Sequence, residues 1–436
     1  MKDATVSLGF DRDTFESVTK SRDEPEWLRD LRMEHWDRYE ALPWPSQRDE
    51  EWMRTDIRLF HLDKFGFPAE SSVESAAGDG LLTRGVDLGG HVSAFDSRPH
   101  TAQLKQKWAQ RGVLFGSLDE LVRTHGELIR PHLFRAVNPG YDKFAALHAA
   151  VWSGGTLLYV PRGMVVDEPL HTLSVLSPGA SDFGHTLVIL EDGAEATLLS
   201  ETASLSGDAP GLHCGAVELL LARGAKLRYV NLQNWSSGTW HFAHHKALVA
   251  ADAALQWTIA ALGSRLSKVN QHVALVGRGA HAQVNGVMFT EGKQHLSYHT
   301  LQHHQAPNCK SDLLYKSALQ DSSRTVWRGM IQVDVDAQKT DGYQRNDNLM
   351  LSDHARSDSI PGLEILADDV RCTHGSTTGR VDDEQIFYAR CRGLTRKEAV
   401  RMVVAGFFQQ VFDRITIDSV REALGEAIGR RIREYD

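Results

Sequence analysis

The stretch LVILEDGAEATLL, residues 187–199, joins a nearly all-apolar run to an alternating run through one tight turn. The same order recurs in VELLLARGAKLRYV from Val217, KALVAADAALQWTI from Lys246 and HVALVGRGAHAQVNGV from His272. The turn alanines are spaced by 31, 28 and 27 residues: Ala194, Ala225, Ala253 and Ala280. Such a spacing indicates a stacked repeat, because one pair of strands cannot bury its apolar face alone.

The apolar runs of these repeats are typical of strands that are covered on both faces. The Gly-Ala and Asp-Ala corners suit a sharp turn that repeats along one edge. A meandering antiparallel sheet or a propeller would also produce strand pairs. The short turns, the loose repeat and the lack of a blade signature favour a mainly β fold built as a β-solenoid.

Helical segments flank the repeats. Glu24-Pro25 precedes apolar residues at helical spacing, and Pro43 ends the segment. Near the other end, Thr395 and Glu398 fit a capping box, and Ser419 with Glu422 predicts a second one. The first box precedes a broad apolar stripe: Val400, Val403, Val404, Phe407, Phe408, Val411, Phe412 and Ile415. The expected organisation is a helical or mixed region (1–140), a β-solenoid core (141–393) and a helical tail (394–436).

Composition narrows the function classes. The 436 residues are 42% hydrophobic, and the formal net charge of −9 argues against a general nucleic-acid binder. No run approaches the roughly 18 apolar residues of a membrane span. The first fifteen residues lack the apolar core of a signal peptide. The four cysteines are too few for a disulfide framework, so we expect a reducing cytoplasm, with no membrane and no nucleic acid as partner.

Motifs for two common catalytic chemistries are missing. The segment from Gly286 to Gln294 approaches a phosphate-binding loop, but it has one residue too many between its glycines. It also has Gln where Ser or Thr must hold magnesium, so we predict a hairpin loop there. No G-x-S-x-G motif supports acyl transfer. We therefore expect no ATPase site in this chain.

The chain contains 21 histidines, and HLSYHTLQHHQAP carries His295, His299, His303 and His304. On a strand the first three share one face, and neutral imidazoles can bind zinc or iron. However, a four-residue step on a strand spans about 13 Å, too far for two imidazoles to share one metal. We expect a polar, exposed ladder. A histidine-rich metalloenzyme is the alternative interpretation.

Cys372 and His374 form a second candidate site. On a strand both side chains point the same way, with roughly 6–7 Å between their α-carbons. Thiolate and imidazole are suitable ligands for iron or zinc. Two ligands do not close a site, so the others must come from elsewhere in the chain or from another subunit.

The stretch that contains this pair, QKTDGYQRNDNLMLSDHARSDSIPGLEILADDVRCTHGSTTGRVDDEQIFYARCRGL (338–394), strongly resembles the SufB/SufD family of iron–sulfur cluster assembly proteins. PEWLRDLRMEHWDRYEALPWP (25–45) and EEWMRTDI (50–57) resemble the family's N-terminal region. GGTLLYVPRGMVVDEPLHT (154–172) resembles the entry to its β-helix. The resemblance therefore covers most of the chain.

Within the family the chain is most like SufD. DDVRCTHG (368–375) resembles the SufD version of this turn, where SufB proteins usually carry a Glu-His-Glu pattern. SufB also has a cysteine directly after a Phe-Tyr pair, whereas Ala389 follows Phe387-Tyr388 here. Cys391 has no family counterpart, and we expect it to be buried or incidental.

The resemblance implies a right-handed parallel β-helix that pairs with a SufB-like protein. It also implies that the C-terminal region binds SufC, an ABC-type ATPase whose ATP-driven dimerisation twists the SufB–SufD core. His374 matches the family histidine implicated at the SufB–SufD interface, and Cys372 its neighbouring cysteine. No cofactor is expected to bind this chain stably, but iron or a nascent cluster could bind transiently at the interface.

The expected ATPase-docking residues are Val403, Phe407, Phe408, Val411 and Phe412. The alternative is that these residues cap the open end of the β-helix. A SufB-type scaffold or a homodimer is a close alternative for the chain as a whole. A more remote one is a β-helical carbohydrate-active enzyme, which predicts secretion and an acidic, calcium-binding cleft.

Overall fold

The computed structural model describes residues 9–68, 80–205 and 210–432. Two expectations fall partly outside these ranges. They are the missing leader at residues 1–15 and the last residues of the helical tail.

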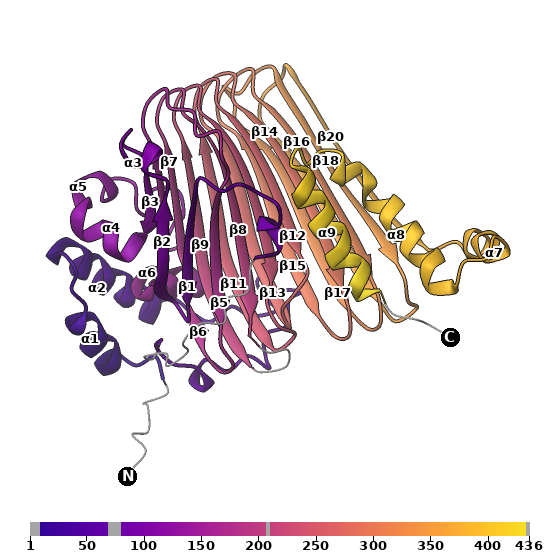
Figure 1. Ribbon diagram of the computed structural model, residues 1–436, viewed down its shortest axis with the longest axis horizontal. Helices are drawn as coiled ribbons and strands as arrows, with labels where there is room; N and C mark the ends of the chain where they lie inside the picture. Colours follow the sequence, from indigo (N-terminus) through magenta and orange to yellow (C-terminus); the bar gives the residue numbers. More distant parts are fainter. Residues whose placement is uncertain (1–8, 69–79, 206–209, 433–436) are drawn as a thin grey trace, which may run out of the picture.

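Two stacked sheets form the body of the molecule, and the chain passes from one to the other at each coil (Figure 1). Sheet A contains, in spatial order, β2 (Arg98–Leu104), β1 (Gly90–Phe95), β5 (Leu170–Leu176), β8 (Glu195–Ser204), β10 (Lys226–Asn234), β12 (Ala254–Ala261), β14 (His281–Thr290), β16 (Lys310–Leu319), β18 (Thr340–Met350) and β20 (Val370–Arg380). Sheet B contains β19 (Arg356–Ile365), β17 (Arg324–Val333), β15 (His295–His304), β13 (Leu266–Leu275), β11 (Thr239–Val249), β9 (Gly211–Leu221), β7 (His185–Leu190), β4 (Thr156–Val160) and β3 (Leu114–Ser117), with β6 (Ser181–Asp182) beside β9.

The pairing is parallel throughout the repeats, so the predicted β-solenoid is confirmed and the antiparallel meander is wrong. Only the pairs β1–β2 and β3–β4, at the N-terminal end, are antiparallel among the named strands of the described residues. The paired strands run from Gly90 to Arg380. They therefore begin before residue 141, where the sequence placed the start of the core.

The spacing of the turn alanines is the length of one coil. In sheet A, Glu195 pairs with Lys226, Lys226 with Ala254, and Ala254 with His281. Each of these residues follows a turn alanine that is fully buried. The residue before each alanine has a positive φ between 58° and 73°: Gly193, Gly224, Asp252 and Gly279. Glycine adopts this conformation without strain and aspartate tolerates it, which explains the Gly-Ala and Asp-Ala corners.

The hairpin predicted between Gly286 and Gln294 is wrong. The chain leaves β14 at Thr290 in sheet A and enters β15 at His295 in sheet B, so these two strands are not partners. Each strand instead pairs in parallel with strands one coil away. A short turn with a positive-φ glycine looks alike in a hairpin and in a solenoid corner, so the sequence could not separate them.

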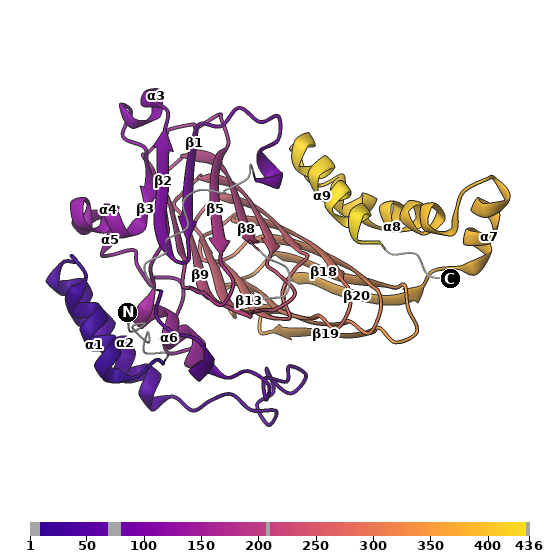
Figure 2. The ribbon, with the colours of Figure 1, turned by 60° about the horizontal axis from the view of Figure 1, so that its bottom comes forward.

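The N-terminal helices cover one end of the solenoid and part of sheet B (Figure 2). They are α1 (Arg12–Ser21), α2 (Glu26–Ala41), α3 (Gln106–Ala109), α4 (Leu118–Thr124), α5 (Gly126–Ile129) and α6 (Lys143–Val151), with 3₁₀ turns η1 (Leu62–Lys64) and η2 (Leu81–Thr83). Helix α2 confirms the predicted N-terminal helix. Phe144 of α6 stacks on Phe242 of β11, with 3.8 Å between ring centroids. The segment between α2 and η1 packs Trp52 into the same apolar cluster.

In the part of the chain that the structure describes, three helices follow the last strand: α7 (Asp383–Cys391), α8 (Arg396–Phe412) and α9 (Asp418–Arg431). Helix α7 lies within the segment that the sequence assigned to the core. The capping box at Thr395 is confirmed, with both reciprocal hydrogen bonds present. The second box is wrong, because α9 begins at Asp418 and places Ser419 inside the helix. Helices α8 and α9 pack on the outer face of sheet A, whereas α7 projects beyond β20 (Figures 1 and 2).

Candidate functional site

The solenoid ends in an unfinished coil. Strands β19 and β20 are the outermost strands of the two sheets at the C-terminal end of the solenoid, and no strand in the described part of the chain pairs with their outer sides. Every residue of β20 is exposed or half-buried. Gln344, Asn346 and Asn348 of β18 are buried, yet the residues paired with them in β20 are not. Positions that are core in one coil therefore lie open in the next.

Cys372 and His374 lie on this last strand. Gly342 and Gln344, their partners on β18, place both on the same face of β20, the face that continues the solenoid interior. Cys372 is half-buried, and a Cβ added at Gly342 would lie 3.2 Å from its sulfur. Burial raises the pKa of the Cys372 thiol, so it is held in the protonated form. His374 is exposed at the open end.

The two residues supply part of a coordination site. No group of three or more His, Cys, Asp or Glu side chains in the described ranges could hold a metal ion. Closed zinc sites need four protein ligands, and clusters are usually held by several thiolates. One imidazole and one protonated thiol at an open end can therefore contribute to a shared site but cannot form one alone.

The predicted docking residues of the tail divide into two sets. Phe408 and Val411 are fully buried and Phe412 nearly so, in a cluster with outward-facing residues of sheet A. Val403 and Phe407 are half-buried, and Lys316 lies over the Phe407 ring and donates to its carbonyl oxygen at 2.9 Å. These residues attach α8 to the side of the solenoid. They therefore do not cap its open end, which was the alternative role considered from the sequence.

An exposed apolar surface lies on the adjoining helices. Phe387 is 69% exposed, Tyr388 61% and Met402 54%, across α7 and α8. Tyr388, Met402 and Val403 line an open groove of about 610 Å³ between these helices. We call Phe387, Tyr388 and Met402 the tail patch. The Phe-Tyr pair was visible in the sequence only as a marker for the family, because nothing there showed that it faces solvent.

Cys391 is exposed at the end of α7. It is therefore not buried, although burial was one of the two expectations from the sequence.

The histidine ladder is less exposed than expected. His295, His299 and His303 do share the outer face of β15, but all three are half-buried. Thr55 of the N-terminal segment donates to Ser297 between them, at 2.8 Å. Burial lowers the pKa of His295 to about 4. The ladder is half-buried because a segment more than two hundred residues away covers it.

His299, His303 and His304 each have a separate partner. His299 Nδ1 accepts from Lys268 Nζ at 2.8 Å, and His303 Nε2 bonds Asp334 at 2.9 Å. His304 faces the other way and bonds Ser311 inside the solenoid. They do not converge on one point, which agrees with the distance argument from the sequence.

Within the described ranges, no helix is both long and apolar enough to cross a membrane.

Family comparisons agree with the architecture. The model described as "SUF system FeS cluster assembly, SufBD core domain" matches residues 174–407, and "SufBD protein N-terminal region" matches residues 15–172. Iron–sulfur cluster assembly protein SufB of Bacillus subtilis is 26% identical over 420 residues, covering 92% of this chain and 88% of its own length. An iron–sulfur cluster assembly SufBD family protein of Staphylococcus haemolyticus shows the same identity and coverage over 429 residues. The chain thus belongs to the SufBD family of the SUF iron–sulfur cluster assembly system.

Proposed function

We propose that this chain acts as the SufD-like subunit of an iron–sulfur assembly complex, paired with a SufB-like scaffold. Two features support SufD over SufB. The turn DDVRCTHG lacks the Glu-His-Glu pattern that the resemblance associates with SufB, and Ala389 stands where SufB carries a cysteine after Phe-Tyr. The chain works as an assembly component in the cytoplasm, without an ATPase site of its own.

The observation that carries this proposal is the unfinished coil. Exposed strand edges have unpaired N–H and C=O groups and pair readily with another chain. A second solenoid docked against β19 and β20 would continue both sheets and enclose their shared interior. His374 and Cys372 would then face ligands from the partner. Iron or a nascent cluster would be cargo at this junction, since the two side chains form only half a site.

A SufC-like ATPase would bind the tail patch. Its exposed aromatic residues are the kind that dominate interface energetics. The buried set, Phe408, Val411 and Phe412, would connect the patch to sheet A, because α8 packs on β14 and β16. Force applied to α7 and α8 would thus reach the coils next to the open end. The expected docking residues Val403 and Phe407 would lie at the margin of this interface.

The experiment compares His374→Ala with His354→Ala in cells that depend on this chain. His354 is exposed on the turn before β19, so it is a matched control away from the solenoid interior. We expect both variants to co-purify with the SufB-like and ATPase partners. Only His374→Ala should lower iron–sulfur enzyme activities, by at least tenfold. Unchanged activities in that variant would refute the site assignment, and loss of co-purification would reduce His374 to a structural role.

A homodimer or SufB-type scaffold is the second candidate. The relative from Bacillus subtilis is named SufB, and the same open edges could pair with a second copy. Native mass spectrometry of the chain purified alone and with the SufB-like protein separates the two. A heterodimer that forms at the expense of any homodimer supports the SufD role.

A further inference from the structure

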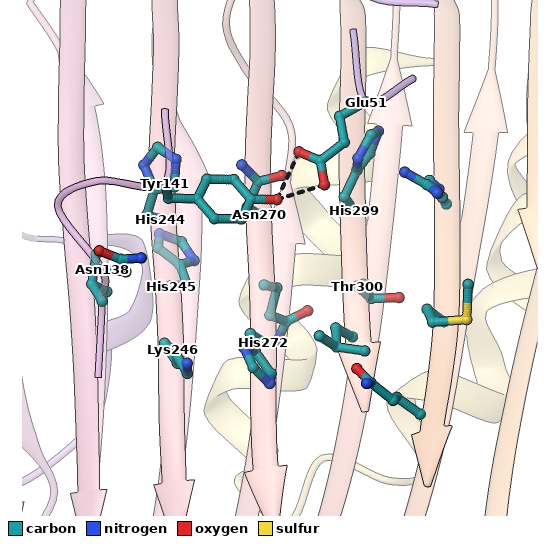
Figure 3. A pocket seen from close by; sticks show the side chains of 16 residues that line it. Glu51, Asn138, Tyr141, His244, His245, Lys246, Asn270, His272, His299 and Thr300 are labelled. Atoms are coloured by element: carbon teal, nitrogen blue, oxygen red, sulfur yellow. Dashed lines mark hydrogen bonds between the residues drawn. The ribbon is translucent and has the colours of Figure 1, made fainter. Parts of the chain in front are cut away.

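A pocket of about 240 Å³ lies on the outer face of sheet B, and β17, its strand nearest the open end, pairs with the edge strand β19. Its floor is formed by four neighbouring strands, β11, β13, β15 and β17, and part of its roof by the N-terminal region (Figure 3). The floor residues on this outer face form two rows in register: His244, Asn270, His299 and Arg328, then Lys246, His272, Leu301 and Met330. The function proposed above does not use this pocket.

Hydrogen bonds fix the roof in place. Tyr141 donates to the carboxylate of Glu51, with 2.6 Å to each oxygen, so two distant segments meet over the floor (Figure 3). Lys268 donates to the Glu51 carbonyl oxygen at 3.1 Å. His244 bonds Asp142, which caps helix α6. The pocket is therefore a built feature of the fold and not a gap between loose side chains.

Three polar groups of the floor have no hydrogen-bond partner among the described residues. Asn270 Oδ1 and His272 Nε2 are buried and make no hydrogen bond to any residue in the described ranges. Lys246, paired with His272 in the register, makes no hydrogen bond or ion pair with any residue that the structure describes. A buried polar atom without a partner is unfavourable, so a cluster of such atoms needs an explanation.

Among the cations that line the pocket, Lys246 has no direct ion pair with a described residue, and Glu218, its register partner on β9, acts on it only through a Coulomb interaction. Arg328 is paired with Glu50 at 2.7 Å, and the Glu51 carboxylate accepts from Tyr141. Asp142 is engaged by His244. Burial lowers the pKa of Lys246, an energetic penalty that an anion beside it would relieve. An apolar wall comes from Val137, Leu301 and Met330, beside further polar lining residues.

We propose that this pocket binds a small organic acid. Its anionic group would accept from Lys246 and His272, a hydroxyl group would donate to Asn270 Oδ1, and a ring-sized apolar body would pack on Leu301 and Met330. Small-molecule sites combine an apolar wall with a few placed polar groups in this way. The volume lies just below the ~300 Å³ at which drug-sized pockets begin, so the ligand is small.

Isothermal titration calorimetry with 4-hydroxybenzoate tests the site, because this probe carries a carboxylate, a ring and a hydroxyl group. Full-length protein should bind it saturably at one site. The isosteric neutral probe 4-hydroxybenzamide should bind at least tenfold more weakly, because it lacks the charge that matches Lys246. Inorganic phosphate should bind more weakly than the acid, because it lacks the apolar body. Equal affinity for the acid and the amide would overturn the proposal, as would no saturable heat from the acid.

Lys246→Met should weaken 4-hydroxybenzoate binding at least tenfold. Lys310→Met is the matched control, since Lys310 is an exposed strand lysine on sheet A. It should bind the probe as the wild type does. Unchanged affinity in Lys246→Met would also overturn the proposal. If Lys246→Met fails to fold, the comparison of acid and amide on the wild-type protein still decides the outcome.

Discussion

Gln344 and His374 lie directly opposite each other in the parallel register of β18 and β20, yet Gln344 is fully buried and His374 is exposed. The Gln344 amide donates to the carbonyl oxygens of Gly329 and Gly362, on two successive strands of sheet B. His374 occupies the same position one coil later. It is exposed because the described chain places no further coil beyond it.

Substitutions at Phe408 and Phe387 should distinguish a residue that stabilises the fold from one that binds a partner. Phe408→Ala removes a fully buried ring between α8 and sheet A, so the free energy of unfolding should fall by about 3–5 kcal/mol. Phe387→Ala removes an exposed ring and should change it by less than about 0.5 kcal/mol. Urea denaturation measures both values.

For binding of the SufC-like ATPase, the order of the two variants should be reversed, with the larger effect in Phe387→Ala. Phe387→Ala should weaken it at least tenfold, measured by calorimetry with the folded variant. Unchanged ATPase affinity in Phe387→Ala would remove the tail patch as the docking surface. Point variants are the sharper tool here, because deleting the chain from Thr395 would also uncover the apolar cluster on sheet A.

The two predicted capping boxes should differ in their contribution to stability. Thr395→Ala should lower the free energy of unfolding by about 1 kcal/mol, because its hydroxyl accepts from a backbone N–H at the start of α8. Ser419→Ala should be neutral or slightly stabilising, because Ser419 lies inside α9 and alanine has the higher helix propensity. Equal losses in the two variants would contradict these helix starts.

Acid should destabilise the fold through its buried histidines. Burial lowers the pKa of His245 from 6.5 to about 3, so between these values the unfolded chain binds the proton and the folded chain does not. The free energy of unfolding therefore falls as pH decreases below about 6.5, by roughly 1.4 kcal/mol per pH unit for this group. Between pH 6.5 and 5, the free energy of unfolding of His245→Leu should fall by about 2 kcal/mol less than that of the wild type, measured by urea denaturation. The exposed control His354→Asn should follow the wild type, and a common slope for all three proteins would reject this cause.

Because Lys268 is buried, the fold should become more stable at alkaline pH. Burial lowers its pKa from 10.5 to about 7, so between these values only the unfolded chain holds the proton. The contribution of Lys268 to the free energy of unfolding therefore rises with pH from about 7 to 10.5. Between pH 7 and 9 the wild type should gain about 2–3 kcal/mol relative to Lys268→Met. Parallel pH profiles of the two proteins would show that Lys268 keeps its proton in the fold.

The repeat could be predicted from sequence because the corners determine it locally. Gly224 and Asp252 hold a positive φ, and the alanine after each is buried, so the coil length appears directly as the spacing. The hairpin at Gly292 was wrong because the turn itself does not encode which strand will be its partner. Ser419 fits the pattern of a cap, but the α9 helix begins one residue earlier.

Other features depend on contacts between distant segments. The stripe from Val403 to Phe412 predicted an apolar helix face correctly, but only the fold shows that sheet A covers most of it. Lys246 and His272 become neighbours through the coil register, and Tyr141 reaches their pocket from the N-terminal region. No local pattern in the sequence indicates these juxtapositions.

Hydrogen–deuterium exchange of this chain, alone and bound to the SufB-like partner, tests the central claim most directly. If the last coil is the pairing surface, binding should slow exchange of the backbone amides of β19 and β20 at least tenfold, and those of β11 and β13 should not change. Slowed exchange confined to other strands, or no change at β19 and β20 in a fully formed complex, would contradict the account.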